Sequence, residues 1–84
     1  MLQLTYEWGY RTVEPYAYGL GKENQELLRA FQTGGASESG DPVGWKLFKV
    51  DEIRRVTLLG ETFRARQEYR RDDKAMTKAI YAQL

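Results

Sequence analysis

The chain has 84 residues, of which 42% are hydrophobic and 30% charged, and its formal net charge at pH 7 is +1. This length allows one small domain, residues 1–84, and the composition is that of a globular chain rather than a disordered one. The sequence contains no cysteine and no histidine. That composition argues against disulfides, thiolate metal sites and histidine-based catalysis, so we expect no metal, no cofactor and no catalytic residue.

The distribution of charged and apolar residues limits the kinds of binding partner that we expect for this protein. Residues 1–60 carry seven basic and eight acidic side chains, whereas residues 61–84 carry six basic and four acidic ones. The protein as a whole is not strongly positive, so it could bind a polyanion only through a local patch of basic side chains. No apolar run approaches the roughly 20 residues that span a bilayer, and no signal peptide opens the chain, so we expect a soluble, cytoplasmic protein without membrane contacts.

The first half of the chain is predicted to form strands. Residues 2–8 alternate apolar and polar side chains, which is typical of a half-buried strand. Residues 11–18 are rich in Thr, Val and Tyr, and Pro15 among them indicates an edge position or a bulge because proline cannot donate a ladder hydrogen bond. Residues 26–32 suit a helical face or a strand, and the turns on both sides favour the strand.

The second half begins with a Gly- and Ser-rich stretch, residues 33–44, which we expect to be a mobile hairpin loop. Residues 45–50 and 53–59 continue as strands. Residues 63–71 alternate arginine with other side chains and are predicted to be a basic extended arm. Asp72 and Asp73 then suit the positive N-terminal end of a helix over residues 73–83, where Met76, Ile80 and Leu84 would form an apolar stripe. The predicted fold is thus mainly β, a small antiparallel barrel of about five strands over residues 2–63, or a strongly curved sheet, with a C-terminal helix.

The order of landmarks resembles the WYL domain family, a small ligand-sensing module of bacterial transcription regulators. The resemblance is carried by Tyr6, Arg11-x-Val13-Glu14-Pro15-Tyr16, Glu26-Leu27-Leu28-Arg29-Ala30-Phe31, Phe48-x-Val50-Asp51-x-Ile53 and Phe63. It implies an SH3-like or Sm-like five-stranded barrel that holds a negatively charged ligand. The chain departs from the family where Glu26-Leu27-Leu28 replaces Trp-Tyr-Leu, and where Lys46 and Glu52 replace arginines that hold ligands in the family.

Two sets of residues are candidate binding sites. A cleft for an anionic ligand or nucleotide would use the cations Arg11, Lys46 and Lys49 with the stacking faces of Tyr16 and Tyr18. Phosphates of a single-stranded nucleic acid would contact Arg64, Arg66, Arg70 and Arg71. The alternatives are solvated strand-edge cations, tyrosines that pack in the core, and arginines that pair with neighbouring acidic residues.

The sequence therefore predicts a non-enzymatic regulatory module that binds a ligand or nucleic acid. The adjacent carboxylates Asp51-Glu52 and Asp72-Asp73 diverge from one another, so neither pair suits acid–base catalysis. The alternative is a structural or protein-interaction domain that dimerises, or docks on a larger protein, through a barrel edge or the C-terminal helix.

Overall fold

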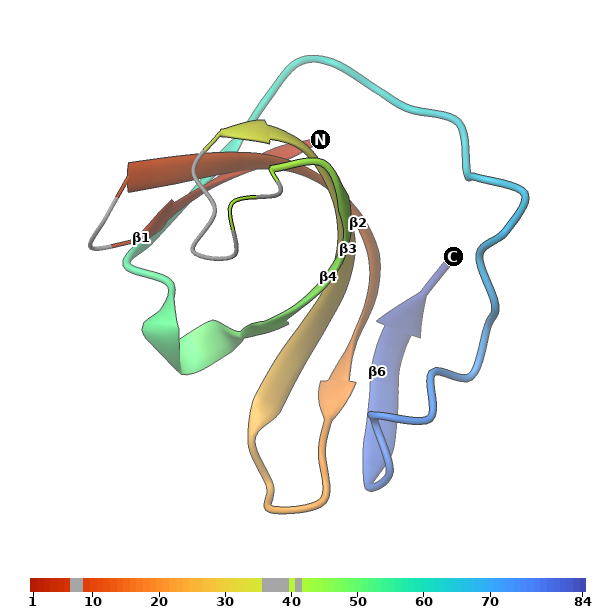
Figure 1. Ribbon diagram of the computed structural model, residues 1–84. Coiled ribbons are helices and arrows are strands. Elements are labelled where there is room, and N and C mark those ends of the chain that lie inside the picture. The colour runs from red at the N-terminus through yellow and green to blue at the C-terminus, as the bar shows by residue number, and fades with distance from the viewer. Residues whose placement is uncertain (7–8, 36–39, 41) are drawn as a thin grey trace.

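The computed structural model describes residues 1–6, 9–35, 40 and 42–84. Its elements are the strands β1 (Leu2–Tyr6), β2 (Gly9–Leu20), β3 (Glu26–Gly35) and β4 (Gly44–Lys49), the 3-10 helix η1 (Val50–Glu52), and the strands β5 (Arg55–Leu58) and β6 (Ala79–Gln83). All pairings are antiparallel, in the order β4-β3-β2-β1-β5, and β6 pairs separately with β2 (Figure 1). The predicted mainly β fold is confirmed, and the five predicted strands correspond to β1 to β5.

The sheet is strongly curved but open, so the predicted closed barrel is wrong. Within the described residues β4 and β5 do not pair, and each forms one edge of the sheet. After β4 the chain turns through η1, where the Ile53 amide donates to the Val50 carbonyl, and the Arg54 amide then bonds Thr5 of β1. The strand that follows has four residues, all exposed, and it pairs only with β1. Because β5 is this short, it does not extend to the free edge of β4.

The predicted C-terminal helix is also wrong, because residues 79–83 form strand β6. The reason lies in β2, whose 12 residues are longer than β1 can cover. On that edge β1 pairs with Gly9–Val13, and β6 takes the stretch from Ala17 to Leu20. An isolated short helix is marginal in water, whereas a strand added to an open edge satisfies backbone groups of both segments. The free edge of β2 therefore decides the conformation of this segment.

Each face of the sheet buries its own hydrophobic cluster. Successive residues of a strand point to opposite faces, so Leu28 and Ala30 of β3 lie on one face and Leu27 on the other. The inner, concave face buries Leu4, Val13, Ala30 and Phe48, with Leu2, Tyr6, Leu28 and Ile53 packed against them. The outer face buries Ala17, Leu27 and Met76, with Ala75 and Ile80 beside them. The outer cluster is therefore closed by side chains from beyond residue 74.

A β-bulge at Tyr16 adapts β2 to these two faces. The pairing with β3 passes from Pro15–Ala30 to Ala17–Arg29, so Tyr16 is an extra residue in the ladder. An extra residue shifts the alternation, and Tyr16 and Ala17 both reach the outer face. The sequence-based expectation of an edge or bulge at Pro15 is confirmed as a bulge. Neither β1 nor β6 pairs with Pro15, so its missing N–H interrupts no ladder on that edge.

Two further expectations concern irregular segments. Of the predicted mobile loop, residues 33–35 end β3 and Gly44 begins β4, whereas residues 36–39 and 41 lie outside the described part of the chain. The predicted extended arm is irregular and contains a turn, in which the Tyr69 amide donates to the Arg66 carbonyl at 3.1 Å. Because of this turn, the arm does not keep the alternation that its sequence predicts.

Candidate functional site

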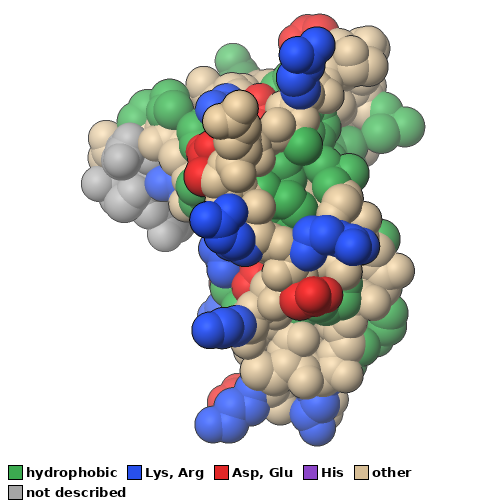
Figure 2. Space-filling view, turned by 90° about the vertical axis from the view of Figure 1, so that its right-hand side faces the viewer, with side chains coloured by type: hydrophobic (Ala, Val, Ile, Leu, Met, Phe, Trp, Pro, Cys, Tyr) green, Lys and Arg blue, Asp and Glu red, His purple; other side chains and the backbone are tan. Residues whose placement is uncertain are grey.

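Residues 61–78, which we call the strap, connect β5 to β6. The strap arcs around the outside of the curved sheet before the chain returns as β6 (Figure 1). It contains no strand and no helix, and its positions are fixed by contacts with β2, β3 and β4. The basic side chains on this side of the molecule form separate groups with acidic ones between them, rather than one continuous patch (Figure 2).

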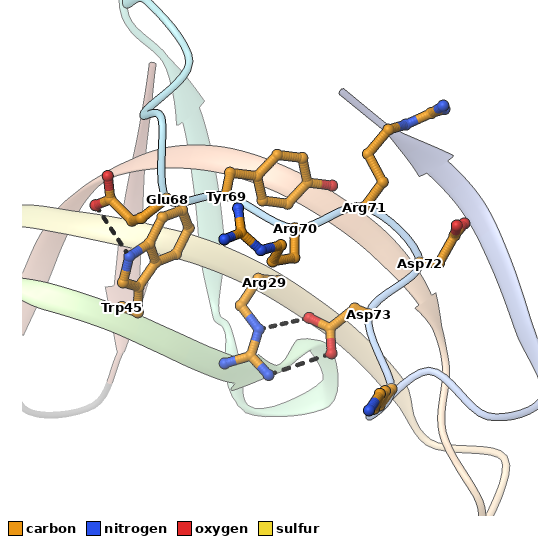
Figure 3. Close-up of a pocket in the computed structure, with 9 residues that line it drawn as sticks. Arg29, Trp45, Glu68, Tyr69, Arg70, Arg71, Asp72 and Asp73 are labelled. Atoms are coloured by element: carbon orange, nitrogen blue, oxygen red, sulfur yellow. Dashed lines mark hydrogen bonds and ion pairs between the residues drawn. The ribbon is translucent and has the colours of Figure 1, made fainter.

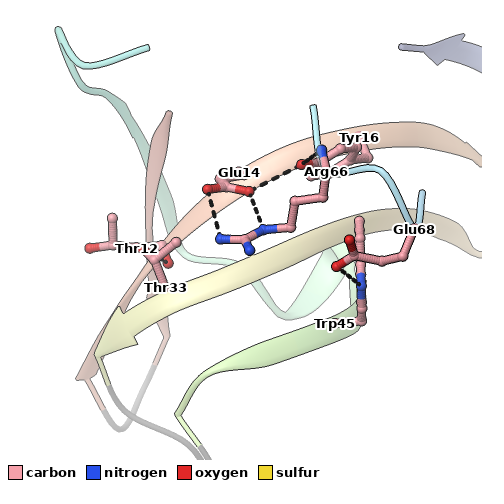
Figure 4. A network of polar contacts seen from close by, with 7 residues as sticks. All are labelled: Thr12, Glu14, Tyr16, Thr33, Trp45, Arg66 and Glu68. Carbon is pink, nitrogen blue, oxygen red and sulfur yellow. Dashed lines mark hydrogen bonds and ion pairs between the residues drawn. The ribbon is translucent and has the colours of Figure 1, made fainter. Parts of the chain in front are cut away.

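The first attachment of the strap is a polar network on β2 (Figure 4). Glu14 is only 7% exposed, and its carboxylate accepts two hydrogen bonds from the Arg66 guanidinium, at 2.9 and 3.3 Å. The Tyr16 hydroxyl donates a hydrogen bond of 3.1 Å to the same carboxylate. It also accepts a hydrogen bond of 2.9 Å from the backbone N–H of Arg66. A buried carboxylate is stable only when several hydrogen bonds or an opposite charge replace its contacts with water. The hydrogen bond to Glu14 in turn raises the pKa of Arg66.

Aromatic rings surround this network. The ring of Tyr16, 2% exposed, lies 4.7 Å from Trp45, 4.8 Å from Tyr69 and 5.4 Å from Phe63, measured between ring centroids. Burial raises the pKa of both Tyr16 and Tyr69. In addition, the Arg66 guanidinium lies 3.6 Å from the centroid of a further ring, Phe31. The arginine is thus stacked on one side and bonded at its edge, a geometry that lysine could not reproduce.

The second attachment joins the strap to β3. The Arg29 guanidinium donates hydrogen bonds of 2.5 and 3.3 Å to the two carboxylate oxygens of Asp73. The same carboxylate accepts a hydrogen bond of 3.0 Å from the backbone N–H of Ala75. The hydrogen bonds from Arg29 are the main reason why the pKa of Asp73 is lowered. Asp73 was expected to begin a helix. Instead its side chain anchors the strap, and Asp72 beside it adopts a left-handed backbone conformation with φ 61°.

Between these two attachments the strap and the sheet enclose an open cleft of about 410 Å³ (Figure 3). Trp45 of β4 and Tyr69 of the strap present nearly parallel rings, with an interplanar angle of 22° and centroids 6.2 Å apart. The complete lining consists of Arg29, Trp45, Glu68, Tyr69, Arg70, Arg71, Asp72, Asp73 and Lys74. Four cations thus meet three anions, which leaves the cleft with a small positive excess.

Most charges of the cleft are engaged within the fold. The Trp45 indole donates to Glu68 at 3.3 Å, and Arg71 donates to the Leu84 carbonyl at 3.0 Å. The Asp72 carboxylate accepts the Gln83 amide at 3.1 Å. The side chains of Arg70 and Lys74, by contrast, make no hydrogen bond or ion pair within the described residues. These two cations are therefore available to an external anion.

The structure separates the residues predicted for an anion cleft. Arg11 and Lys46 share the inner face, because they pair with Leu4 and Ala30 of that face. The Arg11 guanidinium lies 4.9 Å from the Tyr6 ring and donates to the buried Gln32 at 3.5 Å. The remaining three residues lie elsewhere. Tyr16 is buried under the strap, and Lys49 is exposed opposite Leu27. The Tyr18 hydroxyl donates a hydrogen bond of 2.9 Å to Glu26, and its ring packs on Tyr81.

The predicted nucleic-acid arginines also differ in their surroundings. Arg66 is committed to Glu14 and Phe31, and Arg71 to the carbonyl of Leu84. Arg64 and Arg70 are exposed, and their side chains make no hydrogen bond or ion pair in the described part of the chain. Of these two, only Arg70 lines the cleft. The basic arm is therefore in part a structural attachment.

Sequence reasoning missed four residues of the cleft, Arg29, Trp45, Tyr69 and Lys74. Trp45 and Tyr69 carried a signal as large aromatic side chains, but their convergence depends on a chain reversal between residues 45 and 69. Arg29 and Asp73 are 44 positions apart, so no local pattern relates them.

Among the described residues, no group of three or more acidic side chains could hold a metal ion. No helix in this part of the chain is long and apolar enough to cross a membrane. No protein-family model, no curated protein and no solved structure matches this chain.

Proposed function

We propose that this protein is a non-catalytic binding module whose cleft takes an anionic ligand with a flat ring system, as in a nucleotide. The observation that carries the proposal is the cleft itself, in which two near-parallel aromatic rings stand beside two uncommitted cations. Its volume of about 410 Å³ suits a ligand of this size, since small-molecule sites commonly enclose ~300–1,000 Å³.

The chemistry of the lining supports an anion that also carries a ring. Arg70 and Lys74 can each donate charge-assisted hydrogen bonds to phosphate or carboxylate oxygens. Trp45 and Tyr69 offer aromatic surface to a base, and stacking of this kind contributes ~1–3 kcal/mol per base. The resemblance to WYL domains supports the same general class, a regulatory module that recognises a negatively charged ligand.

The proposal is tested by titrating the protein with ATP and, separately, with a single-stranded oligothymidylate, by calorimetry at two salt concentrations. Replacing Arg70 and Lys74 together by alanine should weaken binding about 10- to 100-fold, which corresponds to the ~1–3 kcal/mol of charge-assisted hydrogen bonds. Binding of the unaltered protein should also fall as salt rises. The two probes distinguish a free nucleotide from a nucleic-acid strand.

A matched control uses the same charge change outside the cleft. Arg64 and Lys78 are exposed cations of the strap that do not line the cleft, so their double alanine variant should bind nearly as the unaltered protein does. Equal losses in both double variants would reduce the interaction to nonspecific charge attraction and contradict the proposal.

A second location for the same function is the inner face, which Arg11 and Lys46 share. If the Arg11→Ala/Lys46→Ala variant loses binding while the cleft variant keeps it, the ligand occupies the inner face. Glu52→Arg should then tighten binding, because it replaces a repelling carboxylate by the residue type found in WYL domains.

A further inference from the structure

Strand β5 leaves one edge of the sheet open to another chain. The Leu59 amide donates to the Met1 carbonyl, which continues the β1–β5 register in which Thr57 faces Gln3 and Arg55 faces Thr5. Backbone groups alternate in direction along an antiparallel strand. The odd-numbered residues of β5 therefore bond β1, and Val56 and Leu58 direct their N–H and C=O groups away from the sheet.

The side chains of the same two residues are apolar and exposed. Val56 and Leu58 lie opposite Leu4 and Leu2, so they share the inner face with the core, yet they are 54% and 83% exposed. A leucine this exposed beside free backbone groups is unusual, because natural edge strands are commonly protected by charge, proline or a covering segment. Apolar side chains and unpaired backbone groups thus coincide on this edge.

The other two edges of the described sheet carry features that disfavour pairing with a second copy. The strand β4 carries Lys46 and Lys49 and no acidic residue, so two copies of it would bring cations together. The strand β6 pairs with β2 on one side, and Asp72 and Arg71 of the strap bond its Gln83 and the adjacent Leu84. The strand β5 carries a single cation, Arg55, and no other described segment bonds the backbone of its outward edge.

We propose that two copies of this chain form a two-fold symmetric dimer by antiparallel pairing of their β5 strands, centred on Thr57. In this register Val56 of one copy faces the partner's Leu58, and the outward N–H and C=O groups of both residues bond one another. The same residues meet again on the other side of the axis, so the contact is self-complementary and closes after two copies. A continuous sheet then crosses both copies.

The charges that flank β5 fit this register. Arg55 lies opposite the partner's Leu59, and the partner's Glu61 follows two residues later, beyond the bend at Gly60. Long side chains reach diagonal neighbours across paired strands, and Arg55 and Glu61 both have long side chains. Arg55 and Glu61 are both exposed, and neither side chain makes a hydrogen bond or ion pair with the described residues of its own chain. Each dimer would contain this pair of opposite charges twice, and that complementarity favours a second copy over an unrelated peptide.

The test is the oligomeric state of the full chain, measured by sedimentation equilibrium over a wide concentration range without added nucleotide. The unaltered protein should show a monomer–dimer equilibrium. Arg55→Glu and Glu61→Arg should each weaken the dimer about tenfold, because each turns two attractions into two repulsions, and the double variant Arg55→Glu/Glu61→Arg should restore it to within about threefold.

A backbone variant tests the edge independently of charge. Val56→Pro removes an N–H that points to the partner and not to β1, so the fold should persist, as shown by circular dichroism, while the dimer is lost. A chain that remains monomeric up to about 1 mM would overturn the proposal. Dimerisation that Val56→Pro leaves unchanged would place the interface elsewhere, and dimerisation that the charge reversals leave unchanged would contradict this register.

Discussion

At the scale of single residues, the carboxylate of Glu14 shows how a buried charge is held in this fold. It is almost completely buried on the outer face of β2, and the cation that compensates it, Arg66, lies 52 positions further along the chain. Tyr16 completes the arrangement, because its hydroxyl bonds both the carboxylate and the strap backbone. A buried charge without its partner is costly, so the three residues act as a unit.

Replacing Glu14 by glutamine should lower the free energy of unfolding by about 1–3 kcal/mol, because an amide keeps one acceptor but removes the charge that Arg66 compensates. Urea denaturation followed by far-ultraviolet circular dichroism measures this change. The control is Glu68→Gln, an exposed residue that retains an acceptor for Trp45, and it should change stability by less than about 0.5 kcal/mol. Equal effects of both substitutions would contradict the role given to Glu14.

At the scale of elements, β6 shows how the free edge of one strand selects the conformation of another segment. The apolar spacing of residues 76–84 is compatible with a helix, yet Ile80 and Ala79 pair with Gly19 and Leu20 of β2. The close approach depends on Gly19, since a Cβ atom there would lie 2.3 Å from the Ala79 carbonyl oxygen and 2.8 Å from the Met76 sulfur. Gly19 therefore allows β6 and the end of the strap to pack against β2.

Gly19→Ala should accordingly destabilise the protein by about 1–3 kcal/mol, since either the β2–β6 pairing or the Met76 packing must shift. Gly34→Ala is the matched control, because a Cβ atom at that position meets no heavy atom within 4 Å. We expect it to change the free energy of unfolding by less than about 0.5 kcal/mol. If residues 79–83 were helical instead, the two alanine substitutions would give similar midpoints of thermal unfolding.

At the scale of the whole molecule, the strap converts a curved open sheet into a domain with two buried faces. The inner cluster forms from β1 to β4 with Ile53, whereas the outer cluster requires Met76, which is 4% exposed. The ion pair between Arg29 and Asp73 holds the strap beside this cluster and also forms one wall of the cleft. The proposed binding in the cleft and the closure of the outer face would therefore depend on the same residues.

This attachment predicts an acid-sensitive component of stability. The pKa of Asp73 is lowered in the folded state, so the unfolded chain binds its proton first as pH falls. The stabilisation is fully present above the ordinary aspartate pKa of ~3.9 and is lost as the pH falls through the lower folded-state value. Asp73→Asn should therefore show a shallower loss of stability below about pH 4 than the unaltered protein, in urea titrations at a series of pH values. Parallel pH profiles for the two proteins would contradict the attachment.

Local features of the sequence determined the β class, the approximate position of five strands and the irregularity at Pro15. These properties depend on side-chain alternation and on the missing proline N–H, both of which act within a few residues. From the sequence, the basic residues of the strap could be named only as candidate ligand-binding residues, because their surroundings depend on distant parts of the chain. Of the predicted site residues, Arg70 and Arg71 line the cleft and Arg66 supports it through contacts with β2 and β3, whereas Arg11 and Lys46 lie on the other face of the sheet.

Only the tertiary structure decided the state of residues 79–83, the openness of the sheet and the path of the strap. Each depends on a partner far along the chain, as in the pairs Glu14–Arg66 and Arg29–Asp73. A short apolar pattern such as that of residues 76–84 satisfies a helix and a strand equally well, and the outcome is determined by which backbone edge remains unpaired. In this protein that edge belongs to β2, which extends past the end of β1. The C-terminal residues pair with this free stretch as β6, and the strap that leads to β6 therefore lies along the sheet and forms one side of the cleft.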